Sequence, residues 1–204
     1  MFKTYIWATT LVYDPEALPW VPTHWSDFWD LAAFPGQRGL RRSARLCLEL
    51  ALLADGVKAG QVYATLRQVA GVNRAFRKLD QIRSHIQWWE AGAQPLQWLA
   101  SGEVSMAAAY TARSVHLRQQ ALEFPLPWRG RLYDMDSWGV VKGVEHQVAA
   151  QTCIAFAGSS QQQALFAWII HGWPSHSRAL RVDHGFWLDH GQALEERFNH
   201  WAAY

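Results

Sequence analysis

The chain has 204 residues, a formal net charge of +2 at pH 7 and thirteen tryptophans. This length is sufficient for one domain or two small ones with a real core. The charge is too small to favour a nucleic-acid partner, and no run of lysine and arginine supports one. No apolar run is long enough for a transmembrane helix, so we expect a protein that is not membrane-spanning.

The first 13 residues are a poor signal peptide. They contain one lysine and a broken apolar stretch that ends at Asp14, without a small-residue cleavage site. The loop that follows contains Trp20 and Trp25, which we interpret as surface packing residues. The densest basic stretch, Gln37–Arg45, is interpreted as a solvated loop and the start of a helix.

A group of helices is predicted between residues 43 and 85. Ser43 is a typical N-cap for a helix through Leu53, and Asp55 with Gly56 is a typical stop signal. A short helix is predicted over residues 62–69. A longer one follows over residues 73–85, where apolar residues recur every three or four positions.

Residues 86–110 predict a strand–helix–strand unit. Ile86–Trp89 is a short β-prone run, and Val104–Tyr110 is a second run of small and apolar residues. Such a unit is typical of an α/β domain with a mostly parallel sheet, in which we expect the two strands to be neighbours. Ligands of such sheets bind beyond the carboxyl ends of the strands. The segments Glu90–Gln94 and Tyr110–Arg113 are therefore at a candidate site.

The C-terminal part opens with two prolines within residues 124–128, which suit a linker. Leu132–Val141 predicts a strand, and helices are predicted over residues 145–157, 160–170 and 185–202. Cys47 and Cys153 both lie in apolar helical runs, and we interpret them as buried small residues. A disulfide between them is the alternative.

Several sequence blocks occur in a characteristic order. They are SDFWDLAAFPGQRGLRR, WWE-x-GAQ followed by LASGEV and AYTAR, RLYDMDSWGVVKG, AAQTCIAFAGSSQQQ and the C-terminal FWLDHGQALEERFNHWAA. Together they cover about residues 5–202 and resemble the spermidine/putrescine-type solute-binding proteins of ABC importers. The resemblance implies an α/β fold, a periplasmic-binding-protein-like (type II) lobe with a mixed sheet flanked by helices and an incomplete second lobe.

The resemblance also implies a division of the chain. Residues 1–123 correspond to the second lobe of a solute-binding protein, with a crossover strand at 1–13. Residues 124–204 correspond to a C-terminal return segment that belongs largely to the first lobe. From this resemblance we expect that the sequence contains no counterpart of the family's signal peptide and N-terminal lobe. We therefore expect exposed apolar area around residues 132–141 and the last three helices. A periplasmic location and ABC permease partners are implied by the resemblance alone.

A polyamine site needs carboxylates for ammonium groups and aromatic walls for the methylene chain. Asp136 matches the carboxylate with which the family meets an amine. Asp134 shares its face in a strand, unless the two form a turn or cap pair. Tyr110 falls at an aromatic wall of the family, and Trp138 is its candidate partner. Trp89 is a further candidate because it ends a strand.

Two positions depart from the polyamine binders. Arg113 falls close to an acidic position of the family, and His171 stands where a tyrosine is common. Arg113 could bind a carboxylate in a bidentate pair, or form a salt bridge across the lobe. We therefore expect a ligand that carries both an ammonium and a carboxylate group in preference to a plain polyamine.

Two other functional classes fit the sequence less well. A hydrolase could use Asp134, Asp136 and His171 as an acid–base group, but no nucleophile elbow, P-loop, HExxH or CxxC motif occurs. A carbohydrate-binding module could use tryptophan platforms, but no β-sandwich pattern is present. We therefore expect a binding protein without catalysis, cofactor or metal.

Overall fold

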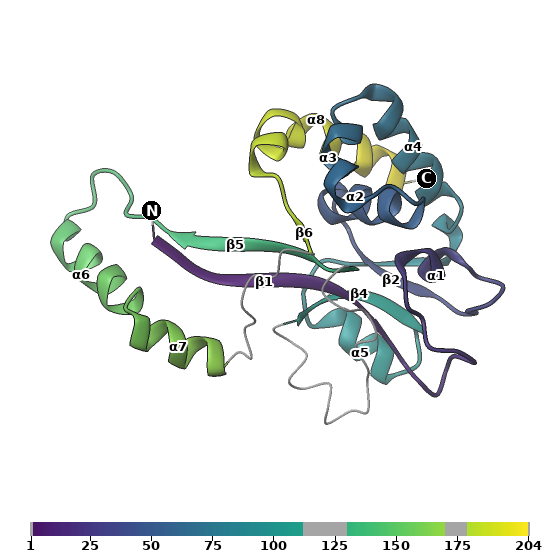
Figure 1. Cartoon of the computed structure of the whole chain (residues 1–204), viewed down its shortest axis with the longest axis horizontal. Coiled ribbons are helices and arrows are strands. Elements are labelled where there is room, and N and C mark those ends of the chain that lie inside the picture. The colour runs from purple at the N-terminus through teal and green to yellow at the C-terminus, as the bar shows by residue number, and fades with distance from the viewer. Residues whose placement is uncertain (1, 112–129, 170–178, 204) are drawn as a thin grey trace.

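The computed structural model describes residues 2–111, 130–169 and 179–203. Within these residues the chain forms a mixed sheet with the strand order β3-β2-β4-β1-β5-β6 (Figure 1). The strands are β1 (Phe2–Tyr13), β2 (Arg38–Arg41), β3 (Ile86–Trp89), β4 (Met106–Tyr110), β5 (Leu132–Trp138) and β6 (Leu180–Arg181). The α-helices are α1 (Trp25–Trp29), α2 (Ala44–Ala54), α3 (Val62–Leu66), α4 (Val69–Asp80), α5 (Gln94–Ala100), α6 (Gln147–Ala157), α7 (Ser160–Ile169) and α8 (His184–Ala202).

The long strand β1 joins the two parts of the sheet. Its second half, Thr9–Tyr13, pairs antiparallel with β4, and its first half, Phe2–Thr9, pairs antiparallel with β5. Leu11 and Val12 point to opposite faces of the sheet and are both fully buried. A strand that is covered on both faces carries apolar residues without alternation, which explains this part of the sequence.

The prediction that the strands at 86–89 and 104–110 are neighbours is wrong, because β2 lies between them. β2 is parallel to both β3 and β4. Gly39 allows the close approach, since a Cβ atom there would lie 3.0 Å from the Cβ of Ala107. The four residues of β2 include only one large apolar side chain, Leu40, so the sequence shows no strand pattern and indicates a solvated loop instead.

Arg38 shows how a basic residue is accommodated inside this sheet. Its buried guanidinium donates hydrogen bonds to the carbonyl oxygens of Phe28 and Gly36, both at 2.8 Å, and to that of Phe34. Burial lowers the pKa of Arg38 to about 10, and Asp30 opposes this shift. The side chain therefore remains charged at neutral pH, and it fastens the loop before β2 to the sheet.

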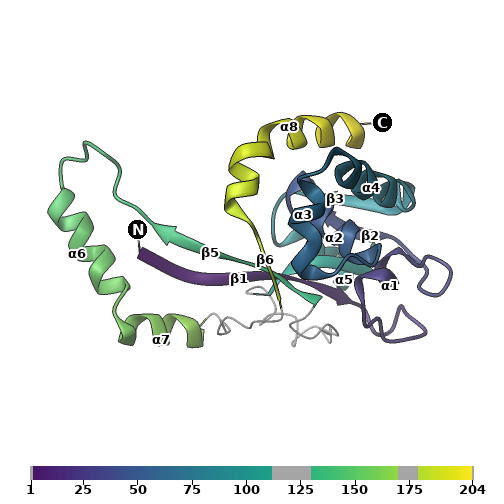
Figure 2. The same ribbon diagram turned by 45° about the horizontal axis from the view of Figure 1, so that its top comes forward.

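Helices cover both faces of the sheet. The larger core lies beneath α1–α4 and α8, and the smaller core lies beneath α5 (Figure 2). Trp25, which the sequence suggested as a surface residue, is buried in the larger core, and its Nε1 donates to the carbonyl oxygen of Gly130. None of the described helices is both long enough and apolar enough to cross a membrane.

The C-terminal helix α8 packs on the same body as α2 and α4. The ring of Trp88 contacts those of Phe198 and Trp201, at centroid distances of 5.4 and 5.9 Å. Trp201 Nε1 donates a 2.6 Å hydrogen bond to Asp80 Oδ1 at the end of α4. The apolar face of α8 thus meets the helices of this body. The assignment of residues 124–204 largely to the first lobe stays a prediction.

An arm formed by residues 2–5 and 137–169 leaves this body, with α6 and α7 at its far end (Figures 1 and 2). Large apolar side chains are exposed on the arm: Trp138, Val141, Val144, Val148, Phe156 and Leu165. The apolar exposure predicted around residues 132–141 and on the last three helices is found at the C-terminal end of β5 and on α6 and α7. On α8, Leu188 is exposed, whereas Phe186, Trp187, Leu194 and Phe198 are buried.

The two cysteines have different environments. Cys47 is buried in α2, and its thiol donates to the carbonyl oxygen of Arg41 at 3.1 Å. Cys153 is exposed on α6, so the expectation that it is buried is wrong. The physical reason is that Cys153 lines an open cavity between the end of β5 and α6, where solvent reaches its side chain. Both thiols are free.

Candidate functional site

Three aromatic side chains meet near the carboxyl ends of β3 and β4. Tyr110 is the last residue of β4, Trp89 is the last residue of β3, and Trp7 lies on β1. The ring of Tyr110 makes edge-to-face contacts with Trp7 and Trp89, each at a centroid distance of 5.4 Å. Trp89 is buried, and its Nε1 donates to the carbonyl oxygen of Ala108 at 3.1 Å. Trp89 therefore supports Tyr110 from within the core.

Asp136 lies beside this cluster and is exposed. Trp7 Nε1 donates a 3.1 Å hydrogen bond to Asp136 Oδ1, so Trp7 contacts both the acid and the tyrosine. Burial raises the pKa of Tyr110. Arg41 and Arg45 oppose this shift, and Asp136 adds to it. The phenol is therefore neutral at physiological pH, and it lies within the field of these three charged groups.

Asp134 has the opposite environment, although it is only two residues from Asp136. It is 2% exposed and forms an ion pair with Arg45 through Oδ2. Its Oδ1 lies 2.6 Å from His184 Nε2 and accepts a 2.7 Å hydrogen bond from the backbone N–H of Met135. Asp134 thus has its charge compensated inside the protein, which is neither of the two roles that the sequence left open for it.

Arg45 reaches Asp134 from an irregular first turn of α2. Leu46 has φ 80° and ψ −45°, a left-handed conformation that side chains other than glycine rarely adopt, and Arg45 has an extended ψ of 130°. The backbone N–H of Leu46 donates to Glu49 Oε2 at 2.9 Å. Ser43, which was predicted to cap this helix, occupies the N-cap position but makes no cap hydrogen bond.

Glu49 is a fully buried carboxyl group beneath this turn. Its Oε1 accepts hydrogen bonds from Tyr63 Oη and Trp187 Nε1, both at 2.8 Å, and its Oε2 accepts the one from Leu46. Burial raises the pKa of Glu49, and these hydrogen bonds oppose the shift. The carboxyl group joins α2, α3 and α8 behind the candidate site.

Gln94 has a local structural role at the start of α5. Its Oε1 accepts hydrogen bonds from the backbone N–H groups of Glu90 and Ala91, at 2.8 and 2.7 Å. Glu90 itself forms a long, exposed ion pair with Arg42 at 3.8 Å. The segment lies at the predicted edge of the sheet, but the side-chain oxygen of Gln94 is occupied by the backbone.

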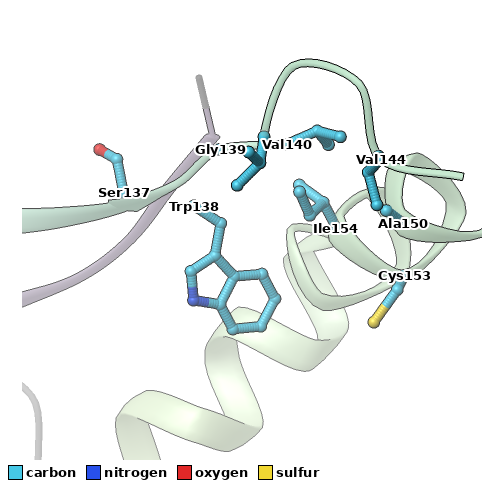
Figure 3. Close-up of a pocket in the computed structure, with 9 residues that line it drawn as sticks. Ser137, Trp138, Gly139, Val140, Val144, Ala150, Cys153 and Ile154 are labelled. Carbon is cyan, nitrogen blue, oxygen red and sulfur yellow. The ribbon is translucent and has the colours of Figure 1, made fainter. Parts of the chain in front are cut away.

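Trp138 lies far from the aromatic cluster. It pairs with Phe2 on β1, whereas Tyr110 pairs with Thr9. Seven residues of extended strand correspond to about 23 Å. The structure therefore does not bring Tyr110 and Trp138 into one wall, because β4 and β5 pair with opposite halves of β1. Trp138 instead lines an apolar cavity of about 490 Å³ between the end of β5 and α6 (Figure 3).

Comparison with known proteins places this chain in a family. Residues 3–188 match the family of bacterial extracellular solute-binding proteins. The chain belongs to that family. It is 45% identical, over an alignment of 222 residues, to a gamma-aminobutyric acid-binding protein of Pseudomonas aeruginosa. The match covers 98% of this chain and 63% of the relative. The chain thus spans less than two thirds of the length of this relative.

Solved structures of solute-binding proteins confirm the predicted fold class. The structure of a GABA receptor has a TM-score of 0.86 and 28% identity, and the match covers 98% of this chain and 68% of that one. A periplasmic binding protein of A. tumefaciens B6 in complex with glucopine has a TM-score of 0.84 and 21% identity, with 98% and 70% covered. A spermidine/putrescine-binding protein of Streptococcus pneumoniae has a TM-score of 0.69 and 16% identity, with 98% and 69% covered. The last two likenesses concern the fold alone.

Two predicted site residues, Arg113 and His171, lie outside the residues that the structure describes. Within the described ranges, no group of three or more histidine, cysteine or acidic side chains is arranged to hold a metal ion. The described part of the candidate site therefore consists of Tyr110 and Asp136, which the sequence predicted, together with Trp7.

Three residues around this site were not predicted from the sequence: Trp7, Arg45 and His184. Trp7 is 129 positions from Asp136, while Arg45 and His184 are 89 and 50 positions from Asp134. Local patterns report neighbours within a few residues, so they contain no signal for such pairs. The sequence signal nearest to these pairs was the basic stretch that ends at Arg45, and we interpreted that stretch as a solvated loop and the start of a helix.

Proposed function

We propose that this chain is the solute-binding component of an ABC importer and that it binds a small amine-bearing solute. The observation that carries this proposal is the exposed carboxylate of Asp136, held by Trp7 beside the ring of Tyr110. An ammonium group gains from such a carboxylate and from neighbouring aromatic faces. Within the part of the chain whose side chains the structure describes from Trp7 onward, Asp136 forms no ion pair, and in our proposal its charge binds the ligand.

The relatives favour an amino-acid-like solute over a polyamine. The Pseudomonas relative is a gamma-aminobutyric acid-binding protein, and the structure with a TM-score of 0.86 is that of a GABA receptor. This solute carries one ammonium and one carboxylate group. In our proposal Asp136 binds the ammonium group and Arg113 binds the carboxylate. The sign of the charge at position 113 supports this orientation.

We propose further that Asp136, Tyr110 and Trp7 form one wall of a cleft between two lobes. In this proposal the cleft closes over the solute by a hinge movement, and the permease subunits of the importer recognise the closed form in the periplasm. The membership of the chain in an extracellular solute-binding family supports these roles. It also favours binding over the hydrolase and carbohydrate-module alternatives.

Isothermal titration calorimetry with γ-aminobutyric acid tests the site. We expect binding by the wild-type chain and a loss of about tenfold or more on Asp136→Asn, because a hydrogen bond to a charged group contributes roughly 1.5–3 kcal/mol. Asp189→Asn is the matched control, since Asp189 is an exposed carboxylate on α8. Absence of wild-type binding, or equal affinity of Asp136→Asn and the wild type, would overturn the proposal.

A further inference from the structure

Asp134 and Asp136 lie on one face of β5, yet they differ in their availability to a ligand. Both carboxylate oxygens of Asp134 are engaged, Oδ2 by Arg45 and Oδ1 by His184 and the backbone. Asp136 is exposed and accepts a hydrogen bond from Trp7, and it forms no ion pair with any side chain that the structure describes from Trp7 onward. The pair therefore offers one free negative charge, although the sequence contains two.

We propose that Arg45 determines the selectivity of the amine site. By neutralising Asp134, Arg45 leaves Asp136 as the single free carboxylate, so the site accepts a solute with one ammonium group and discriminates against diamines. This inference rests on the proposed role of Asp136. Arg45 acts through Asp134 and needs no contact with the solute, so it is a positioning residue.

Electrostatics explain the expected selectivity. A diamine that places one ammonium group at Asp136 would gain from a second carboxylate close by. With Arg45 in place, the charge of Asp134 is compensated, so the second ammonium group finds no carboxylate and its charge stays unpaired. A site can reject a competing solute by leaving one of its charges without a partner.

The fold holds Arg45 in this position from both sides. The backbone N–H of Arg45 donates to Glu195 Oε1 at 3.2 Å, and the next N–H, that of Leu46, donates to Glu49 Oε2 at 2.9 Å. The left-handed conformation of Leu46 is unfavourable for a branched side chain, so it persists only where surrounding contacts enforce it. The two carboxylates supply that enforcement, and the turn directs the guanidinium toward β5.

Calorimetry with γ-aminobutyric acid and putrescine tests the assignment. We expect Arg45→Ala to shift the ratio of the two dissociation constants toward putrescine by about tenfold or more. Arg42→Ala is the matched control. Arg42 lies three residues before Arg45 and carries the same charge, but it pairs with the exposed Glu90. The ratio of the two dissociation constants for Arg42→Ala should equal that of the wild type. The double variant Arg45→Ala/Asp134→Asn should also return to the wild-type ratio, because the released carboxylate is then absent.

His184→Ala provides a second route if Arg45→Ala does not fold. The His184 side chain is half exposed. Its removal leaves Asp134 with the ion pair to Arg45 and the backbone hydrogen bond from Met135, so a smaller shift in the same direction is expected. If His184→Ala and any folded Arg45→Ala both keep the wild-type ratio of the two dissociation constants, the role of Arg45 is overturned. The proposed function then stays intact. If the wild-type chain binds neither solute, the proposed function is wrong and the role of Arg45 is wrong with it.

Discussion

Glu195 Oε1 on α8 accepts a 2.6 Å hydrogen bond from Ser43 Oγ at the start of α2, 152 residues earlier in the chain. The same carboxylate accepts hydrogen bonds from the backbone N–H groups of Ala44 and Arg45, at 2.9 and 3.2 Å. The cap of α2 is therefore supplied by another helix. A negative charge at this end also interacts favourably with the helix dipole.

We expect Glu195→Ala to lower the free energy of unfolding by about 1–2 kcal/mol, the usual cost of losing an N-terminal cap. Urea denaturation followed by circular dichroism measures this change. Glu196→Ala is the control, because Glu196 is exposed and accepts a hydrogen bond from its own helix, from Gln192 at 3.1 Å. Equal losses in the two variants would contradict the capping role.

Glu49 should make the stability depend on pH. Because burial raises its pKa in the folded state, the folded chain binds the proton more tightly than the unfolded chain does. The free energy of unfolding therefore falls as the pH rises from about 4.5 through the folded pKa. Urea titrations at several pH values should show this fall in the wild type and a flatter profile in Glu49→Gln. A wild-type profile that rises relative to Glu49→Gln over this range would refute the assignment.

The two cysteines should react differently with a thiol reagent. Burial raises the pKa of Cys47 and also blocks access to it, whereas Cys153 is exposed on α6. We expect one thiol per native chain to react rapidly with Ellman's reagent, and both to react after unfolding. Cys153→Ser should show no rapid reaction in the native state. Rapid labelling of two thiols in the native wild type would show that the core around α2 opens.

The exposed apolar side chains of the arm should promote association of the isolated chain. We expect Phe156→Ser together with Leu165→Ser to decrease the apparent mass at high protein concentration, as measured by size-exclusion chromatography with light scattering. Val69→Ser is the control, since Val69 is equally apolar and exposed but lies on α4. A wild-type chain that is monomeric over the whole concentration range would contradict this role of the arm.

Most helices and most of the strands could be predicted from local sequence signals. The stop signal after α2 is an example, because Gly56 has φ 81° and glycine tolerates this conformation without a penalty. The strand that ends at Tyr110 and the helix α5 before it follow from apolar runs between turn residues. These features depend on residues within one or two turns of each other, so the sequence by itself determined them. The candidate acid at position 136 came instead from the resemblance of the block RLYDMDSWGVVKG to a family, and its role in binding stays a prediction.

Only the tertiary structure determined the position of β2 in the sheet and the partners of the two acids on β5. Arg38 resembles a solvent-exposed residue in the sequence, but the carbonyl groups that bury its charge come from a loop folded over it. Likewise, Asp134 and Asp136 are equivalent in the sequence, and Arg45 and Trp7 make them different. The partners of the two acids depend on strand order and helix packing, and they lie 50 to 129 positions away along the chain. No local pattern contains them.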